Sequence, residues 1–307
     1  MLWRRILLPP VLRPARAHRP TGARGTAAVQ ELYSAFQDAP VAMAVLEPGG
    51  VLLRANAALG ELLGRPLEAL VGATLFEHTH PDDLDGAVAA CAEMTAGRMD
   101  LSTLECRLLR PDGRLRRALV TTSLVRDRHG APAHLVVHVQ DVTERRALES
   151  ELRHRALHDG LTGLPNRTLF SDRLEQAVAA SRRDGTTFVL MFLDVDRFKA
   201  INDRFGHDVG DTVLIEVARR LREAVRPGDT AARLAGDEFL VLCPDVDGPQ
   251  AEELRRRLLD SVCRPVRTER GELAVSVSAG LALGDARSVP TALLREADQH
   301  MYRAKVR

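Results

Sequence analysis

One run of apolar residues, FVLMFL at positions 188–193, ends directly in the acids Asp194 and Asp196, and it constrains the fold more than any other stretch of the chain. Consecutive apolar residues without alternation predict a strand buried on both faces, which requires a sheet with helices packed over it. A carboxylate at the end of such a strand needs a cap, an ionic partner or a metal ion. We therefore expect a functional site at this end of the sheet.

A second pair of acids, Asp237 and Glu238, follows two small residues in the hairpin-like stretch RLAGDEFLVL at positions 233–242. The turn needs a Gly and at most one Asp or Asn, so it does not explain two acids. Carboxylates drawn close to Asp194 would repel one another unless a cation or a shared proton lay between them. Oxygen ligands alone select a hard cation such as Mg²⁺ over zinc. The alternative for the pair is a polar hairpin tip.

The composition is that of a globular protein without a strong overall charge. A length of 307 residues suggests two domains, and 43 Lys and Arg residues against 42 Asp and Glu residues leave a net charge of +1. No overall field therefore attracts nucleic acid, and any anion site must be local. The absence of a CxxC pair favours free buried thiols in a reducing, cytoplasmic compartment over a disulfide or a zinc site. The four cysteines are Cys91, Cys106, Cys243 and Cys263.

Residues 1–30 form a basic segment that is interrupted by prolines and contains no acid. Its apolar stretch is too short and too broken to span a bilayer. We expect a disordered tail or a mistaken start site. The alternative is a basic leader that touches anionic lipid.

Residues 31–143 predict an α+β module. An apolar strand ends in the turn PGG at 48–50, a strand and a helix follow in VLLRANAALGELLG, and a further helix ends near Gly97. Three more strand-like runs are separated by the turn signals PDG at 111–113 and HGAP at 129–132. This order predicts an antiparallel sheet with helices packed on one face.

This module resembles a PAS sensor domain, by Asn56 in LRANAALGELLG, HPDDL at 80–84, RPDG at 110–113 and DVTERR at 141–146. The resemblance implies a domain that senses a small ligand, haem, flavin or light, or that dimerises, and the ligand stays open. Four histidines, His78, His80, His134 and His138, suggest a haem ligand. His80 precedes Pro81 in a polar loop, and His134 and His138 share one face of a strand, where a surface or partly buried histidine is the simpler interpretation.

The next stretch, residues 144–158, predicts an exposed linker helix. It lacks Gly and Pro, and acids and arginines surround Leu148 and Leu152, which are four residues apart. A seam of two heptads is marginal alone. We expect a parallel paired helix that helps the flanking domains form a homodimer, with a solvated connector as the alternative.

Residues 159–307 alternate helix-like and strand-like runs, and they resemble the GGDEF diguanylate cyclase domain. The motifs are HDGLTGLPNR at 158–167, LDVDRFKAINDRFGHDVGD at 193–211, AGDEF at 235–239 and MYRAK at 301–305. The resemblance implies a ferredoxin-like fold similar to the adenylyl cyclase palm. It also implies condensation of two GTP into cyclic di-GMP with loss of pyrophosphate.

The resemblance assigns roles around the phosphates by position. Asp194, Asp237 and the Val195 carbonyl would hold two Mg²⁺ ions, with Mn²⁺ as a possible substitute. Glu238 would stand beside them as a catalytic residue, and Asp237 is also the family's candidate base. Lys199 and Lys305 would contact phosphate oxygens, as would the backbone amides of Arg197, Phe198 and Lys199.

The resemblance also assigns nucleoside and product sites. Asn202 and Asp211 match the guanine-reading positions, with His207 on the ribose side, although Asp211 has the alternative of a helix N-cap. An acid facing the N1 and N2 donors of guanine would favour GTP over ATP. Arg226 and Asp229 have the RxxD spacing of the site where the product inhibits the family's enzymes.

Two features depart from the family pattern. Ala235 replaces the first glycine of the signature, which is tolerable if its φ stays negative. The family continues after Lys305 with a Gly-Arg-Asn stretch and a last strand, so we expect a fragment or a weakened protein, since a missing strand exposes a sheet edge. The alternatives to a cyclase are an inactive receptor for cyclic di-GMP or GTP and a PAS dimerisation scaffold. The PAS signal and a following phosphodiesterase domain in a longer parent remain open.

Overall fold

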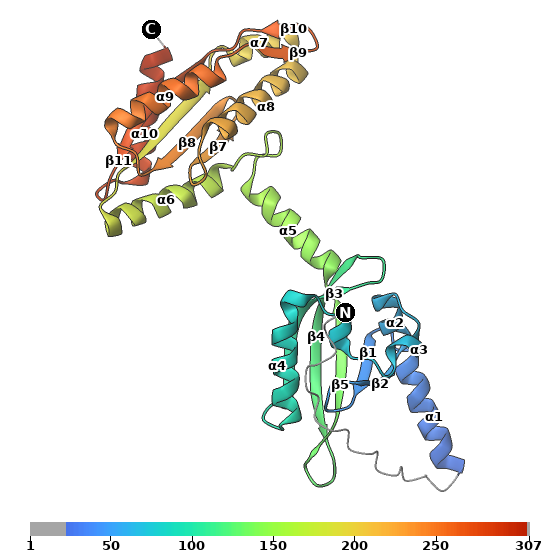
Figure 1. The fold of residues 1–307 in the computed structure, drawn as a ribbon. Coiled ribbons are helices and arrows are strands. Elements are labelled where there is room, and N and C mark those ends of the chain that lie inside the picture. Colours follow the sequence, from blue (N-terminus) through green and yellow to red (C-terminus); the bar gives the residue numbers. More distant parts are fainter. Residues whose placement is uncertain (1–22, 306–307) are drawn as a thin grey trace, which may run out of the picture. The chain divides into compact units, whose positions relative to one another are not determined.

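The structure is a computed structural model that describes residues 23–305, while residues 1–22 and 306–307 lie outside the described part. The chain divides into two compact units, and the division falls between Leu148 and Glu149 (Figure 1). Helix α5 (Thr143–Leu157) carries the chain from one unit into the other. Each unit is built around its own sheet and its own hydrophobic core.

The first unit has a five-stranded sheet in the order β2-β1-β5-β4-β3, with all neighbours antiparallel. The strands are β1 (Ala42–Leu46), β2 (Leu52–Ala55), β3 (Leu101–Leu109), β4 (Leu115–Arg126) and β5 (Pro132–Asp141). The helices are α1 (Ala23–Gln37), α2 (Ala57–Leu63), α3 (Leu67–Leu70), the 3-10 helices η1 (Leu75–His78) and η2 (Pro81–Asp83), and α4 (Leu84–Thr95). This confirms the predicted antiparallel sheet with helices.

Asn56, which carried part of the PAS resemblance, has a structural role. It is fully buried, and its Oδ1 accepts hydrogen bonds from the amides of Met43 (2.9 Å) and Leu59 (3.1 Å). Its Nδ2 donates to the Val41 carbonyl at 2.7 Å. One amide group therefore caps α2 and fixes the entry to β1.

The predicted disordered tail of residues 1–30 is wrong at its C-terminal end. Helix α1 covers residues 23–37, and residues 1–22 of the expected tail lie outside the described residues. The reason is local composition, because the last proline before the helix is Pro20 and the segment that follows contains many good helix formers.

An acid at the end of η2 fastens the helical segment to the sheet. Asp83 accepts hydrogen bonds from the backbone amide (2.8 Å), Nε (2.9 Å) and Nη2 (2.8 Å) of Arg107 on β3. These bonds lower the pKa of Asp83 to about 2. Asp82 beside it is far more exposed, at 70% against 22%, and meets Arg107 only at Nη2.

We expect Asp83→Asn to lower the free energy of unfolding of the first unit by about 1–2 kcal/mol, because it removes the charge from several hydrogen bonds. Asp82→Asn is the matched control and should change it by less than about 0.5 kcal/mol. The pKa of Asp83 is depressed by folding, so its contribution is complete above pH 4 and declines as the pH falls toward about 2. Calorimetric unfolding between pH 6 and pH 3 measures the difference, which should narrow on acidification. Equal losses for the two variants would contradict the assignment.

The second unit has a four-stranded antiparallel sheet in the order β11-β6-β8-β7. Its strands are β6 (Phe188–Val195), β7 (Thr230–Ala235), β8 (Glu238–Pro244) and β11 (Val277–Gly284). Its helices are α6 (Arg167–Asp184), α7 (Phe198–Phe205), α8 (His207–Ala224), α9 (Gly248–Val262) and α10 (Pro290–Lys305), and β9 (Val266–Thr268) and β10 (Gly271–Leu273) form a separate hairpin. When the four sheet strands are numbered along the chain, they lie side by side in the order 4-1-3-2. This is the ferredoxin-like order, which confirms the predicted fold class.

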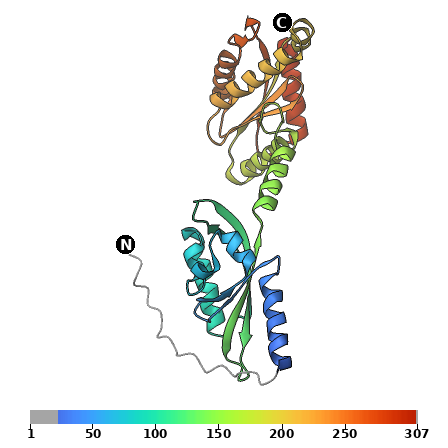
Figure 2. The same ribbon diagram turned by 90° about the vertical axis from the view of Figure 1, so that its right-hand side faces the viewer.

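Helices cover both faces of this sheet (Figure 2). Helices α8 and α9 pack on one face, and α6 and α10 pack on the other. Every residue of β6 is consequently buried, as the unbroken apolar run predicts. The sequence pattern did not predict α7 as a helix of its own, and it did not predict the β9-β10 hairpin.

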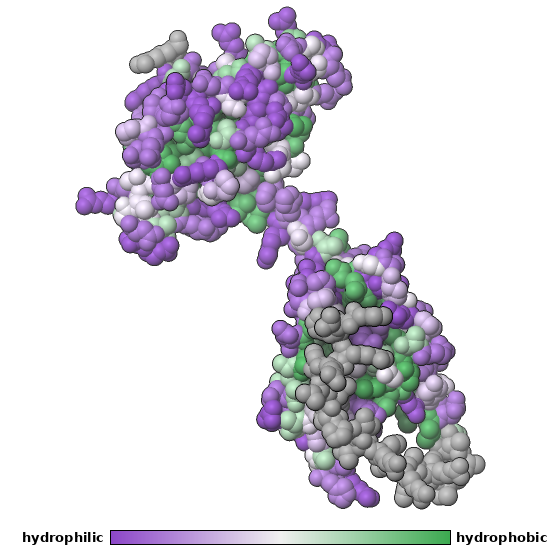
Figure 3. Space-filling view, in the orientation of Figure 1, coloured by the Kyte–Doolittle hydropathy of each residue, from purple (hydrophilic) through white to green (hydrophobic). Residues whose placement is uncertain are grey.

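Polar side chains predominate along the visible face of α5 (Figure 3). Leu148 and Leu152 are 52% and 65% exposed, as expected for a seam without a partner within the chain. None of the helices within residues 23–305 has the length and apolar character needed to cross a bilayer. All four cysteines are free.

Candidate active site

Strand pairing in the second unit brings the two acidic segments together. The Cα register places Asp194 on β6 directly opposite Glu238 on β8. The Val195 amide donates a hydrogen bond to the Asp237 carbonyl at 3.2 Å, which fixes the turn against the end of β6. Asp194, Asp237 and Glu238 therefore lie together at one end of the two central strands.

The electrostatics at this end of the central strands favour a bound cation. Burial raises the pKa of Asp194, which is 8% exposed, and the charges of Asp237 and Asp196 raise it further, against a hydrogen bond from Lys305 Nζ at 2.5 Å. Burial also raises the pKa of Glu238, followed by the charges of Asp194 and Asp237. One lysine thus partly compensates several clustered carboxylates.

The donor set fits a magnesium ion that shares its coordination with a substrate. Among residues 23–305, no three or more acidic, histidine or cysteine side chains already surround one point. Mg²⁺ is usually held by one or two carboxylates together with substrate phosphates rather than by an all-protein cage. Asp194, Asp237 and the buried Val195 carbonyl offer that kind of partial set.

Arg233 holds the acidic turn in place, and the sequence argument missed this role. The side chain is 9% exposed, and its Nε and Nη2 donate to the Gly236 carbonyl at 2.9 and 2.7 Å. Its Nη1 donates to Asp159 Oδ1 at 2.9 Å. The only available signal was that Asp159 belongs to the motif HDGLTGLPNR, for which no role was predicted.

The turn tolerates Ala235 without backbone strain. Gly236 takes the left-handed conformation, with φ of 53°, and therefore uses the freedom of a glycine. Among the described non-glycine residues, positive φ occurs at Arg197 and Asp245 alone, so Ala235 satisfies the condition of a negative φ. The backbone of the turn is thus compatible with the first departure from the signature.

A strained residue follows the end of β6. Arg197 has φ of 55° and occupies the N-cap of α7 without a side-chain cap. The first amides of this helix, beginning with Phe198 and Lys199, have no partner within the helix. Such amides are suited to anions, and the exposed Lys199 side chain stands on the same first turn.

The nucleoside-binding candidates lie on α7 and α8. Asn202 has a buried Oδ1 without a hydrogen-bond partner, and a Cβ added to Gly210 would lie 1.9 Å from that atom. His207 begins α8 and Asp211 lies one turn further on, both exposed. The alternative role of Asp211 as an N-cap is wrong, because the helix begins earlier and its N-cap is Gly206.

Arg226 and Asp229 form an ion pair beside the C-terminal end of β8. Arg226 Nε lies 3.2 Å from Asp229 Oδ1, and its Nη2 donates to the Pro244 carbonyl at 2.6 Å. The Arg226 side chain is 56% exposed whereas that of Asp229 is 2% exposed. The arginine therefore faces solvent and the aspartate orients it.

The fold and the acidic strand ends define a nucleotidyl cyclase palm domain, preceded by a sensor-type domain. The chain belongs to the GGDEF family: residues 156–307 match the model described as "Diguanylate cyclase, GGDEF domain", and residues 36–147 match "PAS fold". Both predicted resemblances are confirmed.

Known proteins are similar to the second unit alone or to most of the chain. Diguanylate cyclase TpbB of Pseudomonas aeruginosa is 42% identical over 159 residues, which are 51% of this chain and 37% of that protein. An uncharacterized signaling protein of Caulobacter vibrioides is 38% identical over 275 residues, or 85% of this chain and 32% of the relative. The chain thus spans about a third of the length of these curated relatives.

A solved structure supports the same conclusion. The coiled coil and GGDEF domain of DgcB from Caulobacter crescentus, in complex with c-di-GMP, superposes with a TM-score of 0.51 at 31% identity. The match covers 54% of this chain and 88% of that one.

Proposed function

We propose that this chain is a sensor-regulated diguanylate cyclase that condenses two GTP into cyclic di-GMP. In each half-reaction a 3′-hydroxyl oxygen bonds to the α-phosphorus of the other GTP and pyrophosphate leaves. The observation that carries the proposal is the register that sets Asp194 opposite Glu238, with Asp237 on the adjoining turn. A purely structural domain would gain nothing from carboxylates whose pKa values are raised.

The phosphate-binding groups follow from the same geometry. Asp194, Asp237 and the Val195 carbonyl would hold two Mg²⁺ ions, for which Mn²⁺ could substitute. When bound, these ions neutralise the triphosphate and lower the pKa of the attacking hydroxyl. Lys199, Lys305 and the first amides of α7 bind phosphate oxygens, and Glu238 adds negative charge beside the metal ligands.

The nucleoside groups select guanine. The unpartnered Asn202 Oδ1 accepts a hydrogen bond from the base, and Asp211 accepts from the N1 and N2 donors. His207 lies on the ribose side. ATP presents an acceptor at N1 and would leave these oxygens unpaired, which is costly in a partly buried site.

The reaction needs two domains, because each domain binds one GTP and the product is symmetric. We place the dimer contact along the PAS domain and α5, whose exposed Leu148 and Leu152 form an apolar seam. Free thiols and GTP as substrate support a cytoplasmic location.

The test is to incubate the purified chain with GTP and Mg²⁺, resolve the nucleotides by chromatography, and run ATP in parallel. Cyclic di-GMP with two pyrophosphates per product, and no product from ATP, is the expected result. Bound GTP or cyclic di-GMP without turnover would contradict the proposal and favour an inactive receptor. The absence of nucleotide binding would leave only a scaffold.

We also propose that cyclic di-GMP inhibits the enzyme at Arg226, with Asp229 as the orienting partner. Arg226→Ala should leave initial turnover within about twofold and raise the product concentration for half inhibition at least about tenfold, because a charged hydrogen bond is worth about 1.5–3 kcal/mol. Arg219→Ala is the control, since Arg219 is an exposed arginine paired with Glu216 and Glu223 on α8. Progress curves with added cyclic di-GMP measure both values. Unchanged inhibition in Arg226→Ala would refute the site.

A further inference from the structure

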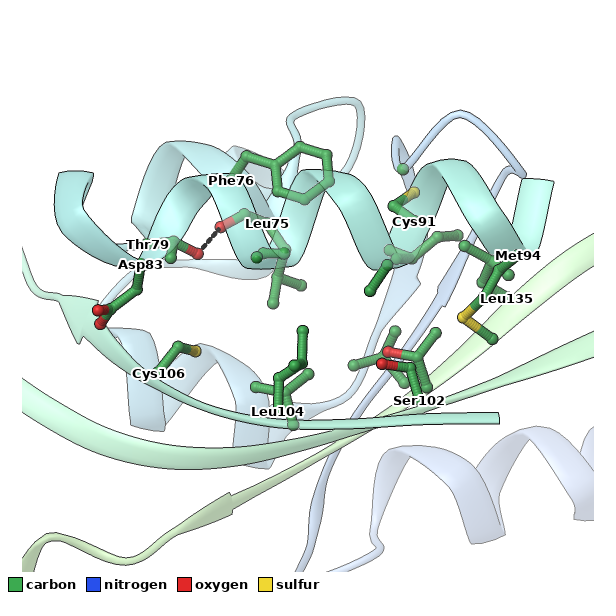
Figure 4. A pocket seen from close by; sticks show the side chains of 18 of the residues that line it. Leu75, Phe76, Thr79, Asp83, Cys91, Met94, Ser102, Leu104, Cys106 and Leu135 are labelled. Atoms are coloured by element: carbon green, nitrogen blue, oxygen red, sulfur yellow. Dashed lines mark hydrogen bonds between the residues drawn. The ribbon is translucent and has the colours of Figure 1, made fainter. Parts of the chain in front are cut away.

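The first unit contains a cavity of about 260 Å³ between the helical segment η1–α4 and the strands β3, β4 and β5 (Figure 4). Leu75 and Phe76 line it from η1, Met94 lines it from α4, and Leu104 and Leu135 line it from the sheet. A dry apolar cavity of about 150 Å³ can hold benzene. This cavity therefore has room for a somewhat larger apolar molecule.

Two hydroxyls in the wall have no partner. Ser102 on β3 lies directly opposite Thr122 on β4, and both line the cavity. Within the part of the chain that the structure describes, neither hydroxyl makes a hydrogen bond. The third hydroxyl, that of Thr79, is already bound to the Leu75 carbonyl at 3.1 Å. Ser102 and Thr122 are thus available to a ligand with one polar group.

The charges around the cavity disfavour an anion. No lysine or arginine is among the described residues that line it, whereas Asp82, Asp83 and Glu105 are. Asp83 and Glu105 remain ionised, because hydrogen bonds from Arg107 lower the pKa of Asp83 to about 2 and those from Arg146 lower the pKa of Glu105. The arginines that pair with these acids do not line the cavity, so a carboxylate ligand would find no cationic side chain among the described lining residues.

The charged end is separate from the hydroxyl end. Asp83 and Cys106 lie at one end of the cavity, and Ser102 and Met94 lie at the other (Figure 4). A ligand whose polar group meets Ser102 therefore places its apolar body along the leucines and away from the carboxylates.

The large cofactors that a sensor domain could hold do not fit this chemistry. No His, Asn or Gln is among the described lining residues. Burial raises the pKa of Cys106 to about 11 and also raises that of Cys91, which disfavours thiolate ligation of haem iron. The volume also lies below the range of about 300–1,000 Å³ that is typical of pockets for larger ligands.

We propose that this cavity binds a neutral, mainly apolar small molecule, either one substituted ring or a chain of roughly eight carbons, whose single polar group hydrogen-bonds to Ser102 and Thr122. The inference goes beyond the proposed cyclase activity, because it names the ligand class of the first unit. It is tested by binding without GTP, so a failure of the cyclase proposal leaves it standing.

The probes are 1-octanol and octanoate, which have the same chain length and differ in charge. Calorimetric titration of the full chain should show binding of 1-octanol, with octanoate at least about tenfold weaker. Ala90→Leu adds volume at a lining residue and should abolish binding of 1-octanol. Ala89→Leu is the matched control, since Ala89 is an exposed neighbour on α4 that does not line the cavity.

A second pair of variants tests the hydroxyls. Ser102→Ala combined with Thr122→Ala should weaken 1-octanol binding about tenfold or more, because two hydrogen bonds are lost. Thr103→Ala, at the next position of β3 and exposed, should leave it unchanged. Any one of three results would overturn the proposal: octanoate binding as tightly as 1-octanol, Ala90→Leu binding like Ala89→Leu, or neither probe binding up to its solubility limit.

Discussion

Asp194→Asn should reduce cyclic di-GMP synthesis by about 10³-fold or more, since a carboxylate that holds a metal ion stabilises transition-state charge by several kcal/mol. The same variant should be at least as stable as the wild type in a metal chelator. The reason is that Asp194 is buried next to Asp237 and has a raised pKa, so its ionised form is disfavoured in the folded protein. Asparagine keeps the shape, can still accept the Lys305 hydrogen bond and carries no charge.

The sign of the pH dependence distinguishes this explanation from simple damage. Because folding raises the pKa of Asp194, the wild type loses stability as the pH rises from the ordinary carboxyl range through the raised pKa. The stability gained by Asp194→Asn over the wild type should therefore be complete at neutral pH and should vanish in acid. Calorimetric melting with chelator and chromatographic assays with Mg²⁺ measure the two effects. Asp172→Asn, an exposed acid on α6 that binds Gln176, should change neither. A variant that is both inactive and less stable would disagree with this account.

Gly210→Ala should lower kcat/KM for GTP by about 100-fold or more while the domain remains folded. A Cβ at position 210 would lie 1.9 Å from Asn202 Oδ1 and 3.2 Å from Phe198 Cζ. The end of the Asn202 side chain must move and the Phe198 ring must shift by a few tenths of an ångström. Both contacts are with side chains rather than backbone, so we expect the cost to folding to be small. The cost to GTP is large, because a displacement of about 1 Å in a binding group can cost about 10²-fold.

Two controls make this result specific. Thr212→Ala, two positions further along α8 and exposed, should retain activity. Asn202→Ala in the Gly210→Ala background should add little, since the same contact is already lost. Steady-state kinetics with GTP and a melting curve are the measurements. Additive losses in the double variant would show that Gly210 acts through another group.

The sequence predicted most elements of both units because their periodicity is strong. The unbroken apolar run of β6 and the alternating runs around the PDG and HGAP turns each predict a strand. Helix α7 was harder to predict, since FKAINDRF has only eight residues and begins two residues after Asp196. A non-glycine residue with positive φ, such as Arg197, has no signal in a single sequence.

The sequence predicted that the acids of the site lie at strand ends, but it did not predict the register that pairs Asp194 with Glu238. A shift of one residue would have placed Asp194 and Glu238 on opposite faces, and only the paired strands decide this. Arg233 was missed for a related reason. An arginine in a strand next to a turn predicts a solvent-exposed side chain, whereas here backbone and carboxylate oxygens accept all of its observed hydrogen bonds.

The position of Arg233 has a consequence for how a signal could reach the chemistry. The Asn166 amide donates to the Leu157 carbonyl at the end of α5, and the Arg233 amide donates to the neighbouring Pro165 carbonyl. The Arg233 guanidinium in turn donates hydrogen bonds to the carbonyl of Gly236, the residue before Asp237. A twist applied to the last turn of α5 would therefore reach Asp237, the proposed metal ligand, through one short chain of hydrogen bonds. Such a linkage needs no contact between the two units, so sensor domains of different kinds could drive the same catalytic domain.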